Sequence, residues 1–297
     1  MGRFNQAFKA FYKTLKANPQ NYAGARVNRL TADWPTNITS PSVILRYSLR
    51  TLRARSRELV INNDYARAFL WLIAKNVVGS EGIKLQNKAK LGDGSLDKKA
   101  NDLIEENYAK FCERGNFDVT GTMSSQDADR MFIQSVARDG EAIIRFVDNF
   151  DNPWGFAVQF LEADHLDEGL NVARMQNGNS IRMGVEFDRW MRPVAYHLLT
   201  AHPGDSAWTW NANTYERIPA YYILHPFMVE RFSQPRGVPW MHSAMTRLNN
   251  IGAYEEAEII GARIGASAMG IWEPKDEMAD MSANPDADST DAEGSPI

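Results

Sequence analysis

The spacing of apolar residues changes from a helical to an extended period near the middle of the chain. Up to about residue 138, apolar positions recur every three or four residues, as they do along one face of a helix. Beyond it the segments EAIIRFV, GFAVQFLEA, SIRMGVEFD, PVAYHLLT and AYYILHP have the composition and pattern of strands. Consecutive strands with short connections predict an antiparallel sheet flanked by helices, and therefore the α+β class.

The first half of the chain is predicted to contain five helices and one short strand, GIKLQ. The helix predicted from Ser124 to Arg138 has Ser125 as its expected N-cap and Asp139–Gly140 as its expected end. In the later segment SIRMGVEFD, the apolar positions alternate cleanly with polar ones, which predicts a single strand with one buried face. The other helices are expected at about 4–15, 45–59, from NND (62–64) to NVVGSEG (76–82), and 96–113.

A long helix is predicted from Trp240 to Met269, with Pro239 at its first turn. Its interior contains glycines, each of which costs roughly 1 kcal/mol relative to alanine in a helix. A ridge of small residues at four-residue spacing lets another backbone approach closely. Charged residues interrupt the apolar run, so the expected neighbour is protein, either the chain's own sheet or another subunit. The ridge consists of Ala253, Ala257, Gly261 and Gly265.

The formal net charge of −4 conceals two oppositely charged ends. Residues 1–60 carry eleven basic and two acidic side chains, a net charge of +9, whereas residues 273–297 carry eight acidic and one basic, a net charge of −7. Such asymmetry favours separate electrostatic partners, although a solvated helix face and a disordered tail explain it equally well. The basic helix at 4–15 could also bind a membrane surface, but docking on protein is favoured. The candidate polyanion contacts are Arg46, Arg50, Arg53, Arg55 and Arg57.

The composition is that of an ordinary globular protein, with 44% hydrophobic and 24% charged residues among 297. The single Cys112 excludes an intramolecular disulfide and favours a reducing compartment. No apolar run is long enough to span a membrane, and the first residues lack the apolar core of a signal peptide. We predict a basic arm with helices at 1–60, an α+β domain at 61–238, the packing helix at 239–270, and an acidic, disordered linker at 271–297.

The sequence contains none of the common nucleotide-binding or hydrolase motifs. The best catalytic candidate is the segment LEADHLDE, where Glu162, Asp164 and Asp167 could hold Mg²⁺ for phosphodiester chemistry. The alternative is an acidic turn that ends a strand and faces water, which is favoured because no second carboxylate cluster matches it. Trp208 and Trp210, two residues apart, are better explained as a partner contact or sheet-edge cover than as a sugar platform. No cofactor is expected.

Several segments follow one another in a specific order: LRARSRELVINNDYA, NVVGSEGIKLQ, ARDGEA, QFLEADHLD, MGVEFDRWMRPVAYHL, and the long helix with SQPRGVPW before it. In this order they resemble the lambda-type portal proteins of tailed bacteriophages. Met191 stands where such proteins usually have a glycine, in the turn before RPVAYHL. The positions that carry the resemblance are Asp139, Gly140, Glu141, Glu162, Asp164, Arg236, Gly237, Pro239, Tyr254 and Glu255.

The resemblance implies a structural, non-enzymatic subunit of a ring, typically a dodecamer, at one capsid vertex. DNA would enter and leave the capsid through it, with the terminase large subunit, capsid or scaffold proteins and head–tail connector proteins as partners. The expected location is the virion, and the host cytoplasm during assembly. Family members continue past the long helix with a stem, clip, tunnel loop and crown, so we expect this chain to correspond to the N-terminal part and wing. The alternative function is a metal-dependent nuclease that uses the Glu162, Asp164 and Asp167 cluster.

Overall fold

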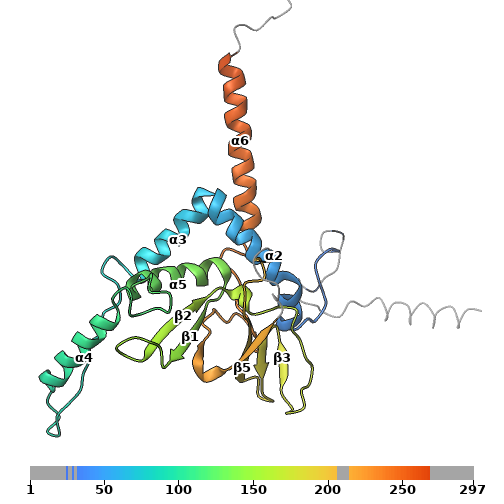
Figure 1. Ribbon diagram of the computed structural model, residues 1–297. Helices are drawn as coiled ribbons and strands as arrows, with labels where there is room; N and C mark the ends of the chain where they lie inside the picture. Colours follow the sequence, from blue (N-terminus) through green and yellow to red (C-terminus); the bar gives the residue numbers. More distant parts are fainter. Residues whose placement is uncertain (1–24, 26–28, 30–31, 206–213, 268–297) are drawn as a thin grey trace, which may run out of the picture.

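Helices and antiparallel strands form one body from which two helices, α4 and α6, project (Figure 1). The computed structural model describes residues 25, 29, 32–205 and 214–267. The α+β class predicted from the sequence is confirmed. The helices are α2 (Pro41–Asn62), α3 (Asp64–Val77), α4 (Lys98–Phe111), α5 (Ser125–Asp139) and α6 (Met245–Ser267).

The strands divide between two antiparallel sheets instead of forming one. The first sheet has the order β2-β1-β7, and the second has the order β3-β4-β5-β6. Apolar side chains from both sheets share one core cluster, which includes Ile143 of the first sheet and Val185 of the second. The strands are β1 (Ile143–Asp148), β2 (Phe156–Leu161), β3 (Ser180–Arg182), β4 (Val185–Phe187), β5 (Pro193–Leu199), β6 (Tyr215–Pro219) and β7 (Ile223–Leu224).

The alternating segment SIRMGVEFD is a hairpin, so the prediction of a single strand there is wrong. Arg182 pairs with Val185 across a two-residue turn formed by Met183 and Gly184. Both turn residues have positive φ, 48° and 83°, which matches the twist of a tight antiparallel hairpin. Alternation alone cannot reveal such a turn, because Met183 remains buried and the apolar pattern continues through it.

Two further local expectations are corrected by the structure. GIKLQ forms no strand, and its Ile83 and Leu85 are exposed because no neighbouring strand pairs with them. The N-cap of α5 is Ser124 instead of Ser125; its side chain accepts from the backbone N–H of Asp127, whose carboxylate completes a capping box. The predicted end of α5 is confirmed, since Gly140 adopts a left-handed conformation with φ 91°.

Helices α2, α3 and α5 pack together along one side of the strands (Figure 1). Helix α2 buries Leu45 and Leu49 against Met183 of the hairpin and Val238. Because α2 continues to Asn62, the boundary expected at residue 60 falls inside this helix. Its far end, together with α3, packs on the residues at which α6 starts.

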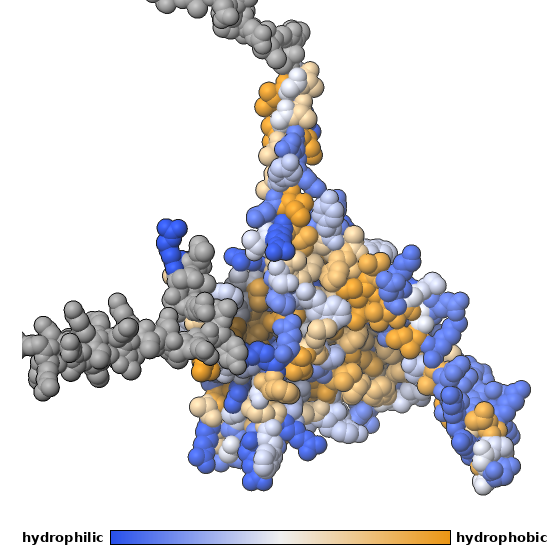
Figure 2. Space-filling view, turned by 180° about the vertical axis from the view of Figure 1, so that it is seen from behind, coloured by the Kyte–Doolittle hydropathy of each residue, from blue (hydrophilic) through white to orange (hydrophobic). Residues whose placement is uncertain are grey.

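Helix α6 begins at Met245 and not at Trp240 as predicted. The backbone N–H of Trp240 donates to the carbonyl of Ala137 on α5, at 3.0 Å, and buried Pro239 precedes it. This tertiary contact holds the approach to the helix in an irregular conformation. From Met245 the helix rises away from the body with apolar side chains open to solvent (Figures 1 and 2).

The small-residue ridge of α6 is not covered by any described part of the chain. A Cβ atom added at Gly261 or Gly265 would find no atom within 4 Å. Ala253 and Ala257 are also exposed. The expectation that the chain's own sheet could cover this ridge is therefore wrong for the described residues, and the other expected neighbour, a second subunit, stays a prediction.

Several predictions lie outside the described residues. These are the basic amphipathic helix at 4–15, the tryptophans Trp208 and Trp210, and the acidic segment at 271–297. Among the helices that are described, none combines the length and apolar character needed to cross a membrane.

Candidate functional site

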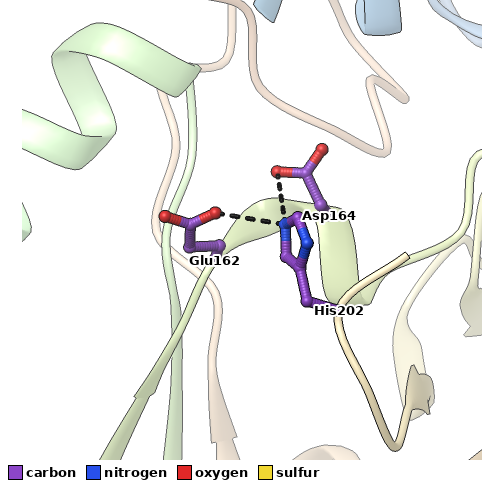
Figure 3. Close-up of side chains that lie close together, drawn as sticks. All are labelled: Glu162, Asp164 and His202. Atoms are coloured by element: carbon purple, nitrogen blue, oxygen red, sulfur yellow. Dashed lines mark ion pairs between the residues drawn. The ribbon is translucent and has the colours of Figure 1, made fainter. Parts of the chain in front are cut away.

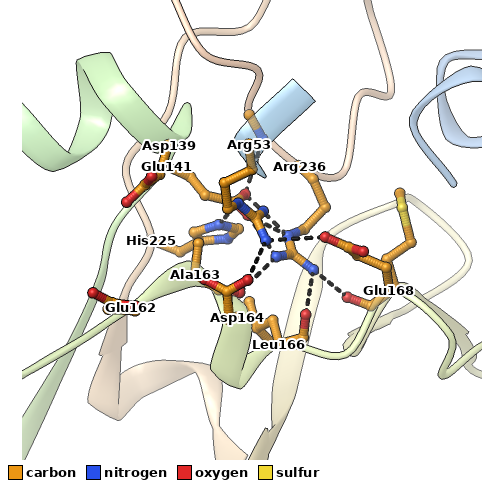
Figure 4. A network of polar contacts seen from close by, with 12 residues as sticks. Arg53, Asp139, Glu141, Glu162, Ala163, Asp164, Leu166, Glu168, His225 and Arg236 are labelled. Atoms are coloured by element: carbon orange, nitrogen blue, oxygen red, sulfur yellow. Dashed lines mark hydrogen bonds and ion pairs between the residues drawn. The ribbon is translucent and has the colours of Figure 1, made fainter. Parts of the chain in front are cut away.

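The centre of the molecule contains a buried ion pair between Arg236 and Glu141, both fully shielded from solvent. The Arg236 Nε lies 2.8 and 2.9 Å from the two carboxylate oxygens of Glu141. The other guanidinium nitrogens donate to three backbone carbonyls, those of Ala163, Leu166 and Met183 (Figure 4). A buried guanidinium is tolerated only when its donors are paired in this way.

Glu141 has further partners that complete its coordination. Arg53 donates to it at 2.8 Å, the His225 Nε2 lies 2.9 Å away, and the backbone N–H of Gly237 donates at 2.9 Å. Burial opposes ionisation, but the charges of Arg236 and Arg53 and the contact with His225 outweigh it and hold the pKa of Glu141 far below its ordinary value. We call Arg53, Glu141, His225 and Arg236 the ionic junction.

Two glycines bring the backbone segments on either side of the junction into direct contact. A Cβ atom at Gly140 would lie 2.3 Å from the carbonyl carbon of Val238, and one at Gly237 would lie 2.1 Å from the carbonyl oxygen of Gly140. No side chain fits at either position, because both obstacles include backbone. The end of α5 and the segment leading to α6 therefore cross at the closest distance that two backbones allow.

Arginines of α2 extend the network to a second set of carboxylates. Arg53 also contacts Glu168 at 2.9 Å and Asp164 at 3.4 Å. Arg57 donates to Asp139 at 2.8 Å and to Asp164. Burial raises the pKa of Asp164, but the charges of Arg53 and Arg57 outweigh this effect and lower it overall.

These contacts correct part of the predicted polyanion surface. Arg53 is 1% exposed and holds three carboxylates of its own chain, so it cannot contact an external phosphate. Arg57 is half-buried and likewise paired. Arg46, Arg50 and Arg55 are exposed and keep the predicted role open.

The proposed metal cluster is also rearranged. Asp167 does not join Glu162 and Asp164; it accepts from the Tyr215 hydroxyl at 2.6 Å instead. The third residue near the two carboxylates is His202, whose Nε2 lies 3.3 Å from Glu162 and 4.0 Å from Asp164 (Figure 3). Because Arg53 and Arg57 already neutralise Asp164, this group is explained by ion pairing. The nuclease alternative has no support.

A second buried carboxylate organises the β3–β6 sheet. Glu186 accepts from Arg217 at 2.8 Å, from Asn179 at 2.7 Å, from Asn177 at 3.1 Å, and lies 3.2 Å from His197. The hydrogen bond from Arg217, partly opposed by burial and supported by the other partners, lowers the pKa of Glu186 to about 2.

Eight of the ten residues that carried the family resemblance fall into two places. Six of them meet in or beside the ionic junction: Asp139, Gly140, Glu141, Asp164, Arg236 and Gly237. Tyr254 is exposed on α6, while Glu255 accepts from the Tyr65 hydroxyl of α3 at 2.8 Å. Met191 adopts a left-handed backbone conformation with φ 62°, as a glycine in this turn would. This conformation is strained for a residue with a side chain.

Sequence reasoning missed the structural role of Arg53, for which a signal existed. Arg53 follows Leu49 by four residues and therefore lies on the apolar face of α2 instead of its polar face. An arginine on a buried face indicates an internal carboxylate partner. His225, Glu168 and His202 carried no such signal, since their partners lie far away in the sequence.

Comparison with known proteins gives a family model, a curated relative and a solved structure. The family model of phage portal proteins, lambda family, matches residues 27–296. The chain is 39% identical over 269 residues to a probable portal protein of Halomonas phage phiHAP-1, covering 90% of this chain and 52% of that protein. It therefore spans about half the length of this curated relative. A solved structure of the neck of an empty GTA particle, computed with C6 symmetry, aligns with a TM-score of 0.43 and 14% identity, covering 84% of this chain and 59% of that chain.

Proposed function

Because the chain belongs to the lambda family of phage portal proteins, we propose that it is a structural subunit of the ring through which DNA enters and leaves a capsid. The observation that carries this proposal is the family match, which extends over residues 27–296. The family is structural, and the buried charges described above serve the fold, so we assign the chain no catalytic step.

Buried contacts tie together the chain segments that meet below the start of α6, which suits a subunit that keeps one shape in a ring. The ionic junction fastens α2, the start of β1 and the turn after β2 to the segment that leads into α6. The crossing of Gly140 and Gly237 removes the remaining freedom between these segments. These contacts hold the segment that leads into α6 against the body, which is compatible with a subunit that repeats in a ring.

The proposed partners follow from this role. They are other copies of the chain in a ring that is typically dodecameric, the terminase large subunit, capsid or scaffold proteins, head–tail connector proteins, and double-stranded DNA in the channel. The proposed location is one vertex of the virion, and the host cytoplasm during assembly. Arg46, Arg50 and Arg55 are the proposed polyanion contacts, and the ridge of Ala253, Ala257, Gly261 and Gly265 is proposed to face a neighbouring subunit.

Immunogold labelling of particles tests this function directly. The chain is expressed with a small epitope tag in cells that produce the particles, and purified particles are imaged by electron microscopy. We expect gold at a single vertex per particle. Label that is absent from purified particles, or that occurs at every vertex, would contradict the proposal. An epitope-tagged major capsid protein, labelled over the whole shell, serves as the control.

A further inference from the structure

A cleft of about 690 Å³ lies between α6 and the start of α3, where both helices meet the end of α2 (Figure 1). One of its walls carries the ring of Tyr65, and the other carries Ile259 and Ile260, all three about half exposed. The Tyr65 hydroxyl donates to the Glu255 carboxylate at 2.8 Å and so connects the two walls. The described chain therefore builds this cleft but leaves its apolar side chains uncovered.

The charged side chains of the cleft are mainly acidic. Asp64, Glu255 and Glu256 line it, against one basic residue, Arg263. All four side chains are exposed, and within the described part of the chain none of the three carboxylates forms an ion pair. Such a surface repels a phosphate backbone, whereas a basic partner with apolar side chains complements it in both respects.

The chain itself contains a segment of this kind, at residues 3–16, which lie outside the described residues. It carries four basic side chains and no acidic one. The other two long stretches outside the described residues do not match the cleft, because 206–213 has no charged residue and 268–297 has eight acidic residues and one basic, a net charge of −7. When residues 3–16 are placed on a helix, one face consists of Phe4, Phe8, Phe11 and Leu15, and the other carries Lys9, Lys13 and Lys16.

The connection to this segment is long enough to reach the cleft of the same chain. Helix α2 has 22 residues and therefore a length of about 33 Å, and Asn62 at its end borders the cleft. Residues 17–40 can span up to about 80 Å, at about 3.3 Å per residue of extended chain. A contact within one chain also acts at an effective concentration in the millimolar range, so that even a weak contact forms.

We propose that residues 3–16 dock in the cleft between α3 and α6 of their own chain. The aromatic face packs on Ile259 and Ile260, and the lysines lie beside Asp64, Glu255 and Glu256. Exposed ion pairs contribute little free energy, so the apolar contact supplies most of the affinity and the charges set the orientation.

The docked segment leaves the small-residue ridge of α6 available. None of the ridge residues Ala253, Ala257, Gly261 and Gly265 lines the cleft, because they follow another side of the helix. A neighbouring subunit and the docked segment can therefore contact α6 at the same time. The docking does not depend on the proposed portal function, since both of its surfaces belong to one chain.

Carbodiimide cross-linking of the full chain tests the proposal, because this reagent joins lysines only to carboxylates in direct contact with them. We expect amide bonds from Lys9 or Lys13 to Asp64, Glu255 or Glu256, identified by mass spectrometry of peptides. Mixing ¹⁵N-labelled with unlabelled chain shows which chain supplies each group, and the bonds should lie within one isotopic form. Bonds found only between chains, or only to carboxylates of residues 273–297, would overturn the proposal.

Two pairs of matched variants separate the docking contact from chance proximity. Ile259→Ser with Ile260→Ser should lower the yield of these bonds about tenfold, because the apolar contact is lost. The control, Ile251→Ser with Ile264→Ser, changes exposed isoleucines outside the cleft and should alter the yield by less than about twofold.

The second pair changes the docking segment and leaves the described fold untouched. Phe8→Ser with Phe11→Ser should lower the yield as the cleft variant does, whereas Asn5→Ser with Gln6→Ser, on the polar side of the same segment, should not. Equal yields from the cleft variant and its control, or from the two segment variants, would show that the cleft does not hold the basic segment.

Discussion

The ionic junction and helix α6 use charged residues and glycines in opposite ways, although Arg236 of the junction lies only nine residues before the start of α6. In the junction every charged group is buried and has its partners inside the chain, and glycine is required because backbone lies against it. On α6 the glycines at 261 and 265 face open space, and isoleucines are exposed beside them. Close backbone contacts explain glycine in the first region, whereas no contact within the described part of the chain explains glycine in the second.

This difference predicts that the residues of the junction maintain the fold and that the ridge residues of α6 act in assembly. A substitution in the junction should destabilise the isolated chain, since partner groups are left buried without compensation. A substitution on the α6 ridge should leave the isolated chain intact and act only when copies associate. Measuring stability and assembly separately therefore tests the comparison.

The largest expected effect comes from Glu141→Gln. The amide cannot balance two buried guanidinium groups, so unfolding free energy should fall by about 3–5 kcal/mol. Urea denaturation at neutral pH measures this loss. The control is Glu106→Gln, which breaks only the exposed pair with Lys110 and should cost about 0.5 kcal/mol or less. Similar losses for both variants would show that the buried ion pair of Glu141 contributes no more to stability than the exposed pair of Glu106.

Gly140→Ala should have the next largest effect and lower the unfolding free energy by about 2–5 kcal/mol. The new methyl meets the Val238 backbone, and the residue must also keep a left-handed conformation. Gly94→Ala is a matched control, because its φ of 85° is similar but no atom lies within 4 Å. Gly94→Ala should lower the unfolding free energy only by the cost of a left-handed backbone at alanine, about 1–2 kcal/mol. Equal losses in thermal or urea unfolding would argue against the backbone crossing.

Acid should weaken the fold through Glu186 in a defined pH range. The pKa of this carboxyl is lowered from 4.5 to about 2, so its contribution is present above about pH 4.5 and is lost as pH falls towards 2. The difference in melting temperature between the wild type and Glu186→Gln should therefore be large at neutral pH and shrink at about pH 2–3. Glu113→Gln, at an exposed position, should show no such pH dependence. A constant difference across pH would contradict the assignment.

Gly261→Leu with Gly265→Leu should separate folding from assembly. Because nothing lies against these positions, the isolated chain should keep or gain stability, by about 1 kcal/mol per site. Association should weaken, as leucine would push away a neighbour packed on the ridge. Calorimetry measures the first quantity and analytical ultracentrifugation the second. Glu256→Leu adds the same side chain elsewhere on α6 and should leave association unchanged; equal association of all variants would show that the ridge faces solvent.

The smallest effect is expected at the exposed arginines. Residues 1–60 should bind polyanions weakly and without sequence preference, with affinity falling steeply as salt rises. Changing Arg46, Arg50 and Arg55 to Gln should flatten this salt dependence, by about 0.9 in logarithmic slope per lost phosphate contact. Fluorescence anisotropy with duplex DNA at several salt concentrations measures it, with Lys98, Lys99 and Lys110 changed to Gln as the control. Deleting residues 273–297 should strengthen binding; an unchanged slope in the arginine variant would assign these side chains another role.

Periodicity located most elements because it reports directly which side chains face a core. It gave the class, the helices α2 to α5 and the strands, as well as the end of α5 at Gly140. It failed at Met183–Gly184, where a buried turn residue continued the alternation, and at Pro239, where a bond from Trp240 to α5 replaced the expected helical turn. Both failures occur where a contact distant in sequence decides the local conformation.

The junction was only partly foreseeable. Glu141, Arg236 and Gly237 were singled out by the family resemblance, but no spacing in the sequence indicates that they meet. The opposite charges of Arg53 and Glu141 permit a pair, yet 88 positions separate them. Charge alone groups Arg53 with the surface arginines, because charge does not report the helix face on which a residue lies.

By itself the sequence determined the α+β class, the family and the presence of a glycine-bearing helix. Apolar periodicity and short motifs depend only on residues that are near one another in the chain. Only the tertiary structure decided which charges are buried and that the ridge of α6 has no partner in the described chain. It also decided that Glu162, Asp164 and Glu168 of LEADHLDE form ion pairs, whereas Asp167 accepts from Tyr215. These properties depend on which distant segments come within a few ångströms of one another. A side chain is buried and desolvated only once the chain has folded, and its surroundings then decide the structural role of a charge or a glycine.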